Sequence, residues 1–260
     1  RNVIESIGAI NVADITANTA VNSGSENNAD SFTSGATQGR TNVNLRGLGL
    51  SSTLVLIDGR RVTFSGAVAN DGSVFVDTSQ IPTIALERVE ILKEGAAAVY
   101  GSDAIAGVVN YIFRRDFTGF EVDITRQQID ATSSARDDRA SFIYGGQFGD
   151  ANVVFAYSTL DRSPMPGTAK NLSPMGVSGL GTSFRNLSGT VTVADTTHPW
   201  YGTNGEYTST FIGDPNCVAN GGTILPDGRC GFAFGPRFNI VNTENHSQVY
   251  ASVELPLDNG

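Results

Sequence analysis

Residues 86–115 read LERVEILKEGAAAVYGSDAIAGVVNYIFRR, and this stretch decides the fold. In its first part, apolar Val89 and Ile91 alternate with charged residues, which is the period-two pattern of a strand with one buried face. Glycines then bound a segment with room only for a short helical turn, and a second, mostly apolar strand follows at 107–113. The stretch therefore predicts a small sheet, crowded with Gly and Ala, that packs closely against another part of the protein.

Further strands are predicted upstream of this stretch. The Asp58-Gly59-Arg60 segment between the apolar run 54–57 and the run 61–64 predicts a β-hairpin. Residues 43–48 predict a strand that ends in the sequence Gly-Leu-Gly. A nucleotide-binding loop needs a third glycine and a following helix, so the sequence argues against a phosphate site here.

The N-terminal part of the chain predicts one short helix. Asn11 is a preferred N-cap residue, and Asp14 in the first turn interacts favourably with the helix dipole, so we expect a helix over 11–18. Residues 1–10 contain no basic segment followed by an apolar one, so we expect any signal peptide to lie upstream or to have been removed.

Three motifs resemble the plug domain of TonB-dependent outer-membrane receptors. They are NLRGLG at 44–49, TLVLIDGRRV at 53–62, and the pieces LERVEILK, GA and YGSDAIAGVVN within 86–110. The resemblance covers residues 44–113 in the order that the family shows. It implies an α+β plug, a small mixed sheet with short helices, followed by the antiparallel strands of a transmembrane β-barrel in a bacterial outer membrane.

Composition limits the alternatives. The chain has 260 residues, of which 40% are apolar, enough to bury a core, and only 17% are charged. A net charge of -9 without a basic stripe argues against a nucleic-acid partner. No apolar run approaches the roughly 18 residues of a membrane-spanning helix, but transmembrane strands need only about 9–11 alternating residues.

From residue 116 onward, the pattern is that of long strands with one apolar face. Phe120, Val122 and Ile124 alternate with acidic or polar residues, and similar runs follow at 139–148, 152–159 and 248–257. The connections alternate between a tight turn at 149–150 and a long loop at about 163–242, which is typical of an outer-membrane barrel. A soluble β-sandwich would also alternate, but it predicts turns of similar length at both ends.

These patterns predict two domains. We expect a plug at 1–115 and the first four barrel strands at 116–260, with the long loop on the extracellular side. Membrane barrels need at least about eight strands, and plugged transporters have about 22, so the sequence predicts a fragment of a larger plugged barrel.

The chain has two cysteines, Cys217 and Cys230, which bracket a loop rich in Gly and Asn. We expect a local disulfide formed in an oxidising compartment, which would contribute on the order of 3 kcal/mol in the chain-entropy model. Two buried free thiols are the alternative. The cysteines lack metal-ligand spacing, and neither His198 nor His246 lies in a catalytic motif, so we expect no enzyme activity, no bound metal and no cofactor.

The resemblance implies a function in nutrient uptake. Receptors of this family bind a scarce nutrient, such as a ferric siderophore, a vitamin or a glycan, on the outer side of the plug, and contact with the TonB energy-transducing protein at the periplasmic side then loosens the plug. The expected partners are therefore TonB, a small-molecule or oligosaccharide ligand and outer-membrane lipid. A TonB-contacting segment is not recognisable in residues 1–10, and a ligand-binding or signalling receptor without transport is the alternative.

Charged residues are the candidates for locking the plug to the barrel wall. Partly buried ion pairs are costly to break one partner at a time, which suits a lock between two domains. The alternative is a set of solvated charges on one face of a plug strand. The candidates are Arg46, Arg88 and Glu90 in the plug and Glu121 and Asp123 in the first barrel strand.

Ligand contacts are expected in two plug loops, 48–52 and 65–73, and in the long loop. Aromatic side chains of the long loop suit stacking on a sugar or an aromatic siderophore, but such residues more often pack a loop on itself or mark the membrane interface. The candidates for ligand contact are Leu48, Leu50, Ser65, Asn70, Trp200 and Tyr201.

Overall fold

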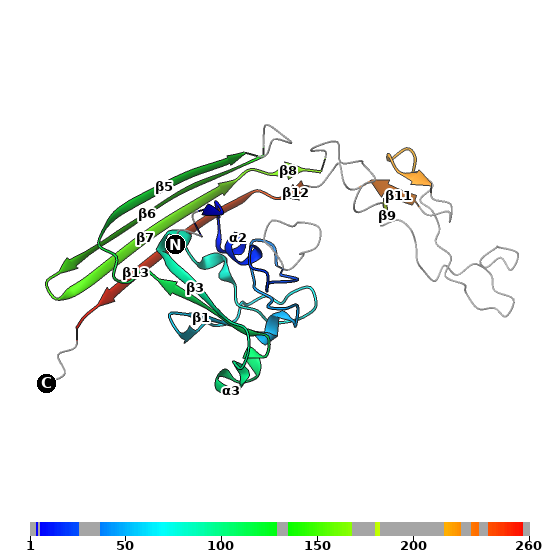
Figure 1. Ribbon diagram of the computed structural model, residues 1–260. Helices are drawn as coiled ribbons and strands as arrows, with labels where there is room; N and C mark the ends of the chain where they lie inside the picture. Colours follow the sequence, from blue (N-terminus) through cyan, green and yellow to red (C-terminus); the bar gives the residue numbers. More distant parts are fainter. Residues whose placement is uncertain are drawn as a thin grey trace, which may run out of the picture. The chain divides into compact units, whose positions relative to one another are not determined.

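A computed structural model describes residues 4, 6–25, 37–128, 135–167, 180–182, 216–224, 230–233 and 239–256. The chain divides into two compact units, one of Arg1–Met165 with Ile240–Gly260 and one of Pro166–Asn239. The first unit contains a mixed sheet with short helices and a larger antiparallel sheet of long strands (Figure 1).

The mixed sheet has four strands in the order β2-β1-β4-β3. β1 runs parallel to β4, while β3 is antiparallel to β4. β1 and β4 are the two central strands, and both are largely buried, with four of five residues buried in β1 and five of seven in β4. The strands are β1 (Thr53–Ile57), β2 (Arg60–Arg61), β3 (Leu86–Leu92) and β4 (Gly107–Phe113).

Short helices connect these strands. α2 (Val12–Ala17) begins after Asn11, and Asn11 and Asp14 each accept the backbone N–H of the other, which is a capping box. α3 (Ala97–Tyr100) joins β3 to β4, as the opening stretch predicted. Among the described residues, no helix is long and apolar enough to cross a membrane. The 3-10 helices are η1 (Leu50–Ser52), η2 (Thr78–Gln80), η3 (Thr83–Ala85) and η4 (Ser102–Ala104).

The antiparallel sheet has four strands in the order β13-β7-β6-β5. Every strand pairs with its sequence neighbour among the long strands, and β5 and β13 are its edges within the described part of the chain. A tight turn at 149–150 joins β6 to β7, as predicted. The strands are β5 (Gly119–Gln128), β6 (Arg136–Phe148), β7 (Ala151–Arg162) and β13 (Glu244–Glu254).

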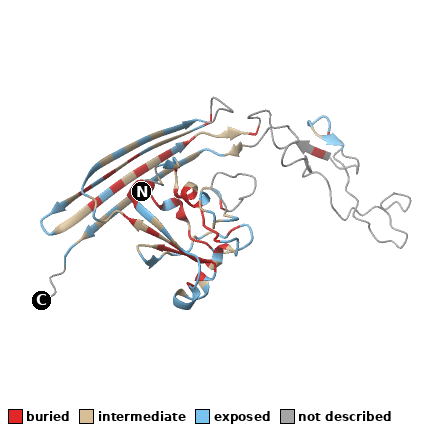
Figure 2. Ribbon diagram, in the orientation of Figure 1, coloured by how far each residue is buried: buried red, intermediate tan, exposed pale blue. Residues whose placement is uncertain are grey.

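The two faces of this sheet differ sharply, as Figure 2 shows by colour. On the outer face, Phe120 is 65% exposed and Ile124 is 81% exposed, although both are large and apolar. On the inner face, Ile143, Val154 and Ala156 are completely buried. An apolar face turned outward is what a lipid environment requires, because lipid tails solvate such side chains and water does not.

One apolar core joins the two sheets. Its centre is Tyr111 of β4, which is fully buried, together with Val109 from the same strand. The buried residues of β6 and β7 named above belong to the same cluster, so the mixed sheet domain packs directly on the inner face of the antiparallel sheet. The mixed sheet domain and the antiparallel sheet therefore share a hydrophobic core.

The second unit contains a small sheet in the order β10-β11-β9. Its strands are β9 (Leu180–Thr182), β10 (Thr223–Ile224) and β11 (Cys230–Ala233). Two further short strands, β8 (Met165–Pro166) and β12 (Asn239–Val241), pair with each other. Cys217 is buried, but the side chain of Cys230 lies outside the described residues, so the disulfide stays a prediction.

Two predicted strands differ from the structure. Residues 43–48 form no strand, because Arg46 and Gly47 have φ of 58° and 67°, and these left-handed residues turn the chain after an isolated bridge between Leu45 and Asn22. The hairpin is confirmed, with Asp58 at φ 48° and Gly59 at φ 75° in its turn, but its second strand is only β2, two residues long.

A close approach at Gly145 yields a first prediction. A Cβ added to Gly145 would lie 2.0 Å from the carbonyl oxygen of Phe117, in the segment that joins β4 to β5. At Gly146 the nearest atom to an added Cβ is 3.6 Å away, which is an ordinary contact. We expect Gly145→Ala to lower the free energy of unfolding by about 1–3 kcal/mol, and Gly146→Ala to change it much less. Denaturant unfolding of the full-length protein in detergent measures both, and equal effects would contradict the packing argument.

Burial of Tyr111 yields a pH prediction. Burial raises the pKa of Tyr111 well above its ordinary value near 10. The folded state therefore favours the neutral phenol, so this contribution to stability is complete below pH 10 and is lost as the pH rises further. Tyr111→Phe lacks the ionisable group, so its unfolding midpoint should fall less than that of the wild type between pH 9 and pH 11. Parallel pH profiles would show that Tyr111 ionises as freely in the folded protein as in the unfolded chain.

Candidate functional site

A line of polar contacts ties the antiparallel sheet to the mixed sheet domain and to the segment that joins β4 to β5. We call this line the polar seam. Its contacts involve charged and amide side chains, whereas the surrounding core is apolar. The side chains that form it are Arg114, Arg115, Glu121, Arg139, Asn152 and Gln248.

Arg139 of β6 makes the most contacts in the polar seam. Its Nη1 donates to the backbone oxygens of Ala9 at 2.8 Å and Ile10 at 3.0 Å, and to Oγ1 of Thr83 at 2.9 Å. Its Nη2 donates to Oδ1 of Asp123 on β5, at 2.8 Å. The side chain is only 10% exposed. One guanidinium thus connects two strands of the antiparallel sheet to two separate segments of the mixed sheet domain.

Arg115 forms a second junction, at the other end of β5. Its Nη2 lies 2.7 Å from Oδ2 of Asp58, and its Nη1 lies 3.3 Å from Oε1 of Glu254 on β13. The other oxygen of Asp58 accepts the backbone N–H of Phe113 at 2.9 Å. The hydrogen bond with Asp58 raises the pKa of Arg115, so the guanidinium stays charged at any physiological pH. The hairpin turn of the mixed sheet is thereby held to the end of a wall strand.

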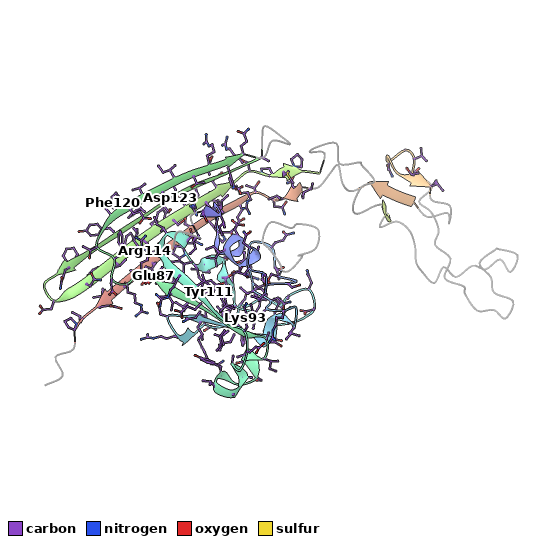
Figure 3. The ribbon with its side chains drawn as sticks, viewed as in Figure 1. Glu87, Lys93, Tyr111, Arg114, Phe120 and Asp123 are labelled. Carbon is purple, nitrogen blue, oxygen red and sulfur yellow. The ribbon has the colours of Figure 1, made fainter. Side chains whose placement is uncertain are left out.

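Arg114, the residue before Arg115, contacts a different set of groups (Figure 3 labels Arg114). Its Nη1 lies 2.8 Å from Oε2 of Glu121 and donates to the backbone oxygen of Ile84 at 3.3 Å. Its guanidinium also stacks over the ring of Phe117, 4.1 Å from the centroid. Arg114 therefore ties the connecting segment to β5, whereas Arg115 ties it to the hairpin turn and to β13.

Two neutral amides complete the polar seam. Gln248 of β13 donates to the backbone oxygens of Ser79 and Ile81 at the end of η2. Asn152 of β7 donates to the backbone oxygen of Arg115 at 2.6 Å. Most acceptors in the mixed sheet domain are backbone carbonyls, which water can also satisfy.

A separate charged cluster strengthens the inner face of the sheet itself. Arg162 of β7 lies 2.9 Å from Oδ2 of Asp137 on β6 and 2.9 Å from Oε2 of Glu244 on β13, and its side chain is only 8% exposed. Both carboxylates compensate one buried cation, so the cluster links three strands.

The plug residues predicted for locking contact other groups in the structure. Arg46 donates to the backbone oxygens of Ile105 and Ala106, both at 3.1 Å, inside the mixed sheet domain. Arg88 pairs with Glu87 and Glu90 on its own strand. None of these pairs reaches the antiparallel sheet, because β3 is an edge strand whose charged side chains are exposed.

Of the predicted barrel residues, Glu121 lies in the polar seam, and Asp123 contacts the seam through Arg139. Glu121 pairs with Arg114, and Asp123 pairs with Arg139 (Figure 3 labels Arg114 and Asp123). Sequence reasoning missed Arg139, Arg114 and Arg115. The alternation of side chains along β6 could have identified Arg139. Arg139 lies two residues before Ser141, so the two residues share the polar face of the strand.

The residues predicted to face a ligand are spread over two loops. Leu48 is 51% exposed, whereas Leu50 is buried in a small cluster with Ala69 and Phe75. Ser65 is half-buried and Asn70 is exposed, and Trp200 and Tyr201 lie outside the described residues. The cluster around Leu50 brings loops 48–52 and 65–73 together. Within the described part of the chain, no group of His, Cys, Asp and Glu could hold a metal ion.

A small α+β domain, joined by a polar seam to the inner face of a sheet whose outer face is apolar, defines the class of plugged outer-membrane receptors. Residues 1–108 match the family model of the TonB-dependent Receptor Plug Domain, so this part of the chain is a plug domain of that family. This family consists of receptors and transporters of the outer membrane, where the chain is therefore located.

The chain is also similar to several known proteins. The chain is 32% identical over 120 residues to the iron-regulated outer membrane virulence protein of Vibrio cholerae serotype O1. The match covers 45% of this chain and 18% of that protein, so the chain spans only about a fifth of its curated relative. Among solved structures, the siderophore receptor PirA from Acinetobacter baumannii has 22% identity and a TM-score of 0.46, covering 62% of this chain and 24% of that one. PirA from Pseudomonas aeruginosa has 26% identity and a TM-score of 0.37, covering 46% and 22%.

The contacts of Arg139 yield a mutational prediction. Arg139→Gln leaves Asp123 without its cation and removes donors from two backbone carbonyls, so we expect a loss of about 3–5 kcal/mol in the free energy of unfolding. Arg126→Gln is the matched control, because Arg126 and Asp138 form an ion pair between the same two strands on the exposed face. We expect that control to change stability little, since exposed pairs are screened by solvent.

Hydrogen exchange of the amides in α2 tests the location of the effect. Arg139→Gln should speed their exchange, because the segment before α2 loses its contact with the wall, whereas Arg126→Gln should not. Equal protection in both variants would show that the Arg139 contacts do not hold this segment.

Proposed function

We propose that the chain is the plug-bearing part of a TonB-dependent receptor that imports a scarce nutrient, with the plug as a ligand-responsive gate. The observation that carries the proposal is the chemistry of the polar seam. The plug is held to the wall by Arg139, Asn152 and Gln248, whose acceptors on the plug side are mainly backbone carbonyls.

Such contacts suit a gate that must open and close. A hydrogen bond inside a protein replaces bonds to water, so its net contribution is only about 0.5–1.5 kcal/mol. Several of them hold the plug firmly in sum, yet each can be exchanged for water as the plug moves. An apolar interface of the same extent would lose its hydrophobic stabilisation when water enters.

An iron chelate is the nutrient that we favour. The support is the name of the Vibrio cholerae relative, which describes that protein as iron-regulated. Vitamins and glycans remain the other members of the class. Loops 48–52 and 65–73 of the plug, with Leu48 and Asn70 exposed, and Trp200 and Tyr201 of the long loop are the proposed contacts for the ligand.

The domain division and the partner complete the proposal. Residues 1–115 form the plug and residues 116–260 provide barrel strands, and the TonB energy-transducing protein engages the plug from the periplasmic side. Glu121 and Asp123 help to hold the plug to the barrel wall through Arg114 and Arg139. The plug residues Arg46, Arg88 and Glu90 are available for contacts with further barrel strands or for solvation. A ligand-binding or signalling receptor without transport is the second candidate.

Growth of a deletion strain tests the proposal. We expect the strain to lose growth on one nutrient from a panel of iron chelates, cobalamins and oligosaccharides supplied as limiting sources. Removal of TonB in the otherwise wild-type strain should reproduce that loss, because import depends on inner-membrane energy. If uptake is unchanged in the deletion strain while the purified full-length receptor still binds a ligand, the signalling receptor replaces the importer.

A further inference from the structure

The start of β1 lies toward the end of the antiparallel sheet from which the long loop leaves. Asp58, which follows β1, is joined through Arg115 to Glu254, close to the tight-turn end of that sheet. Val55, nearer the start of β1, lines a cavity together with Val249, which lies nearer the start of β13. β1 therefore runs beside β13, and η1, which precedes β1, lies on the side of the long loop.

Two plug loops form one surface at this end of the plug. Loop 48–52 contains η1, and loop 65–73 packs on it, because Leu50, Ala69 and Phe75 form one buried cluster. We call the exposed side of these two loops the outer plug surface. The proposed ligand contacts of the plug lie in the same two loops.

The outer plug surface and its flanks expose apolar side chains. Leu48 is 51% exposed and Val68 is 48% exposed. Val68 forms an antiparallel bridge with Val74, which is also exposed, so these two side chains lie on the same face of the loop. Exposed apolar side chains at a binding surface suit contact with a ligand that carries little charge.

The outer plug surface carries one charged group. The structure describes both loops completely, and Asp71 is their only ionisable residue. The backbone N–H of Ser73 donates to its carboxylate at 2.8 Å, and this hydrogen bond holds the pKa of Asp71 below its ordinary value. Asp71 is exposed, so the loop presents a stable negative charge to the solvent.

The nearest cations in the sequence do not give this end of the plug an excess of positive charge. Arg46 precedes the first loop, and its guanidinium already donates to two backbone carbonyls. Lys93 follows β3 at the same end of the mixed sheet, and Glu94 adjoins it. Arg46 and Asp71 balance each other in net charge, as do Lys93 and Glu94.

We propose that the outer plug surface binds an electrically neutral iron chelate, a deepening that rests on the proposed function. The three positive charges of Fe(III) are balanced by three hydroxamate groups, each of which carries one negative charge. Three catecholate groups carry two negative charges each, so their complex keeps an excess of three. An anion of that kind would lose water against apolar side chains and the carboxylate of Asp71 without gaining a cation, which is unfavourable. A neutral tris-hydroxamate complex avoids this cost.

Direct binding to the purified full-length receptor tests the proposal. The probes are a ferric tris-hydroxamate complex and a ferric tris-catecholate complex, and titration calorimetry gives both dissociation constants. We expect the tris-hydroxamate complex to bind about ten-fold more tightly or better at low salt, because the other complex is repelled and poorly desolvated. Equal or tighter binding of the tris-catecholate complex, or no binding of either probe, would overturn the proposal.

Asp71→Lys tests whether this surface sets the preference. The added cation should shift the ratio of the two affinities toward the tris-catecholate complex by about ten-fold at low ionic strength, and salt should shrink the shift. Asp150→Lys is the matched control, because it changes the net charge equally in the exposed tight turn, at the opposite end of the antiparallel sheet. A ratio that is the same in Asp71→Lys as in the control would show that another part of the receptor selects the ligand.

Growth assays separate this proposal from the proposed function. If the tris-catecholate complex supports TonB-dependent growth through this receptor and the tris-hydroxamate complex does not, import stands and the ligand class is wrong. If the receptor binds the tris-hydroxamate complex but its deletion leaves growth on that complex unchanged, the ligand class stands and import fails.

Discussion

The structure depends most on one guanidinium, that of Arg139, on the inner face of the antiparallel sheet. It binds two backbone carbonyls before α2, the hydroxyl of Thr83 and the carboxylate of Asp123. Arginine can do this because its planar group presents five donors in fixed directions while its charge stays constant. The single contact thereby fixes the register of β5 against β6 and the position of the N-terminal segment against both.

The apolar core and the polar seam have different tasks. Tyr111 and Val109 of the plug share one buried cluster with Ile143 and Val154 of the wall, and this cluster supplies most of the stabilisation. The polar seam lies beside the core and fixes the position of the plug relative to the wall, because hydrogen bonds are directional and apolar contacts are not. A plug held by the core alone could slide, whereas a plug held by the polar seam alone would lack stability.

The connection from plug to wall is short and closely packed. Arg114 and Arg115 contact different groups, and the backbone of Phe117 lies so close to Gly145 that no side chain fits between them. The plug and the first wall strands therefore behave as one compact unit. The segment before α2 is joined to the antiparallel sheet both by the hydrogen bonds of Ala9 and Ile10 with Arg139 and by the apolar core, to which Ala9 belongs and against which Ile7 packs.

The sequence alone determined the elements and the family. Period-two alternation predicted β3 and the long strands, and a mostly apolar run predicted β4. Asn11 predicted the start of α2, and the motifs within 44–113 predicted the plug, because each of these depends on local pattern. Only the tertiary structure decided which charges meet. Arg88 pairs along its own edge strand and Arg139 reaches Ala9, 130 residues away, because strand order and register bring them there and no local pattern encodes these. The left-handed turn at Arg46, which replaced a predicted strand, is set in the same way by the carbonyls of Ile105 and Ala106 that its side chain binds.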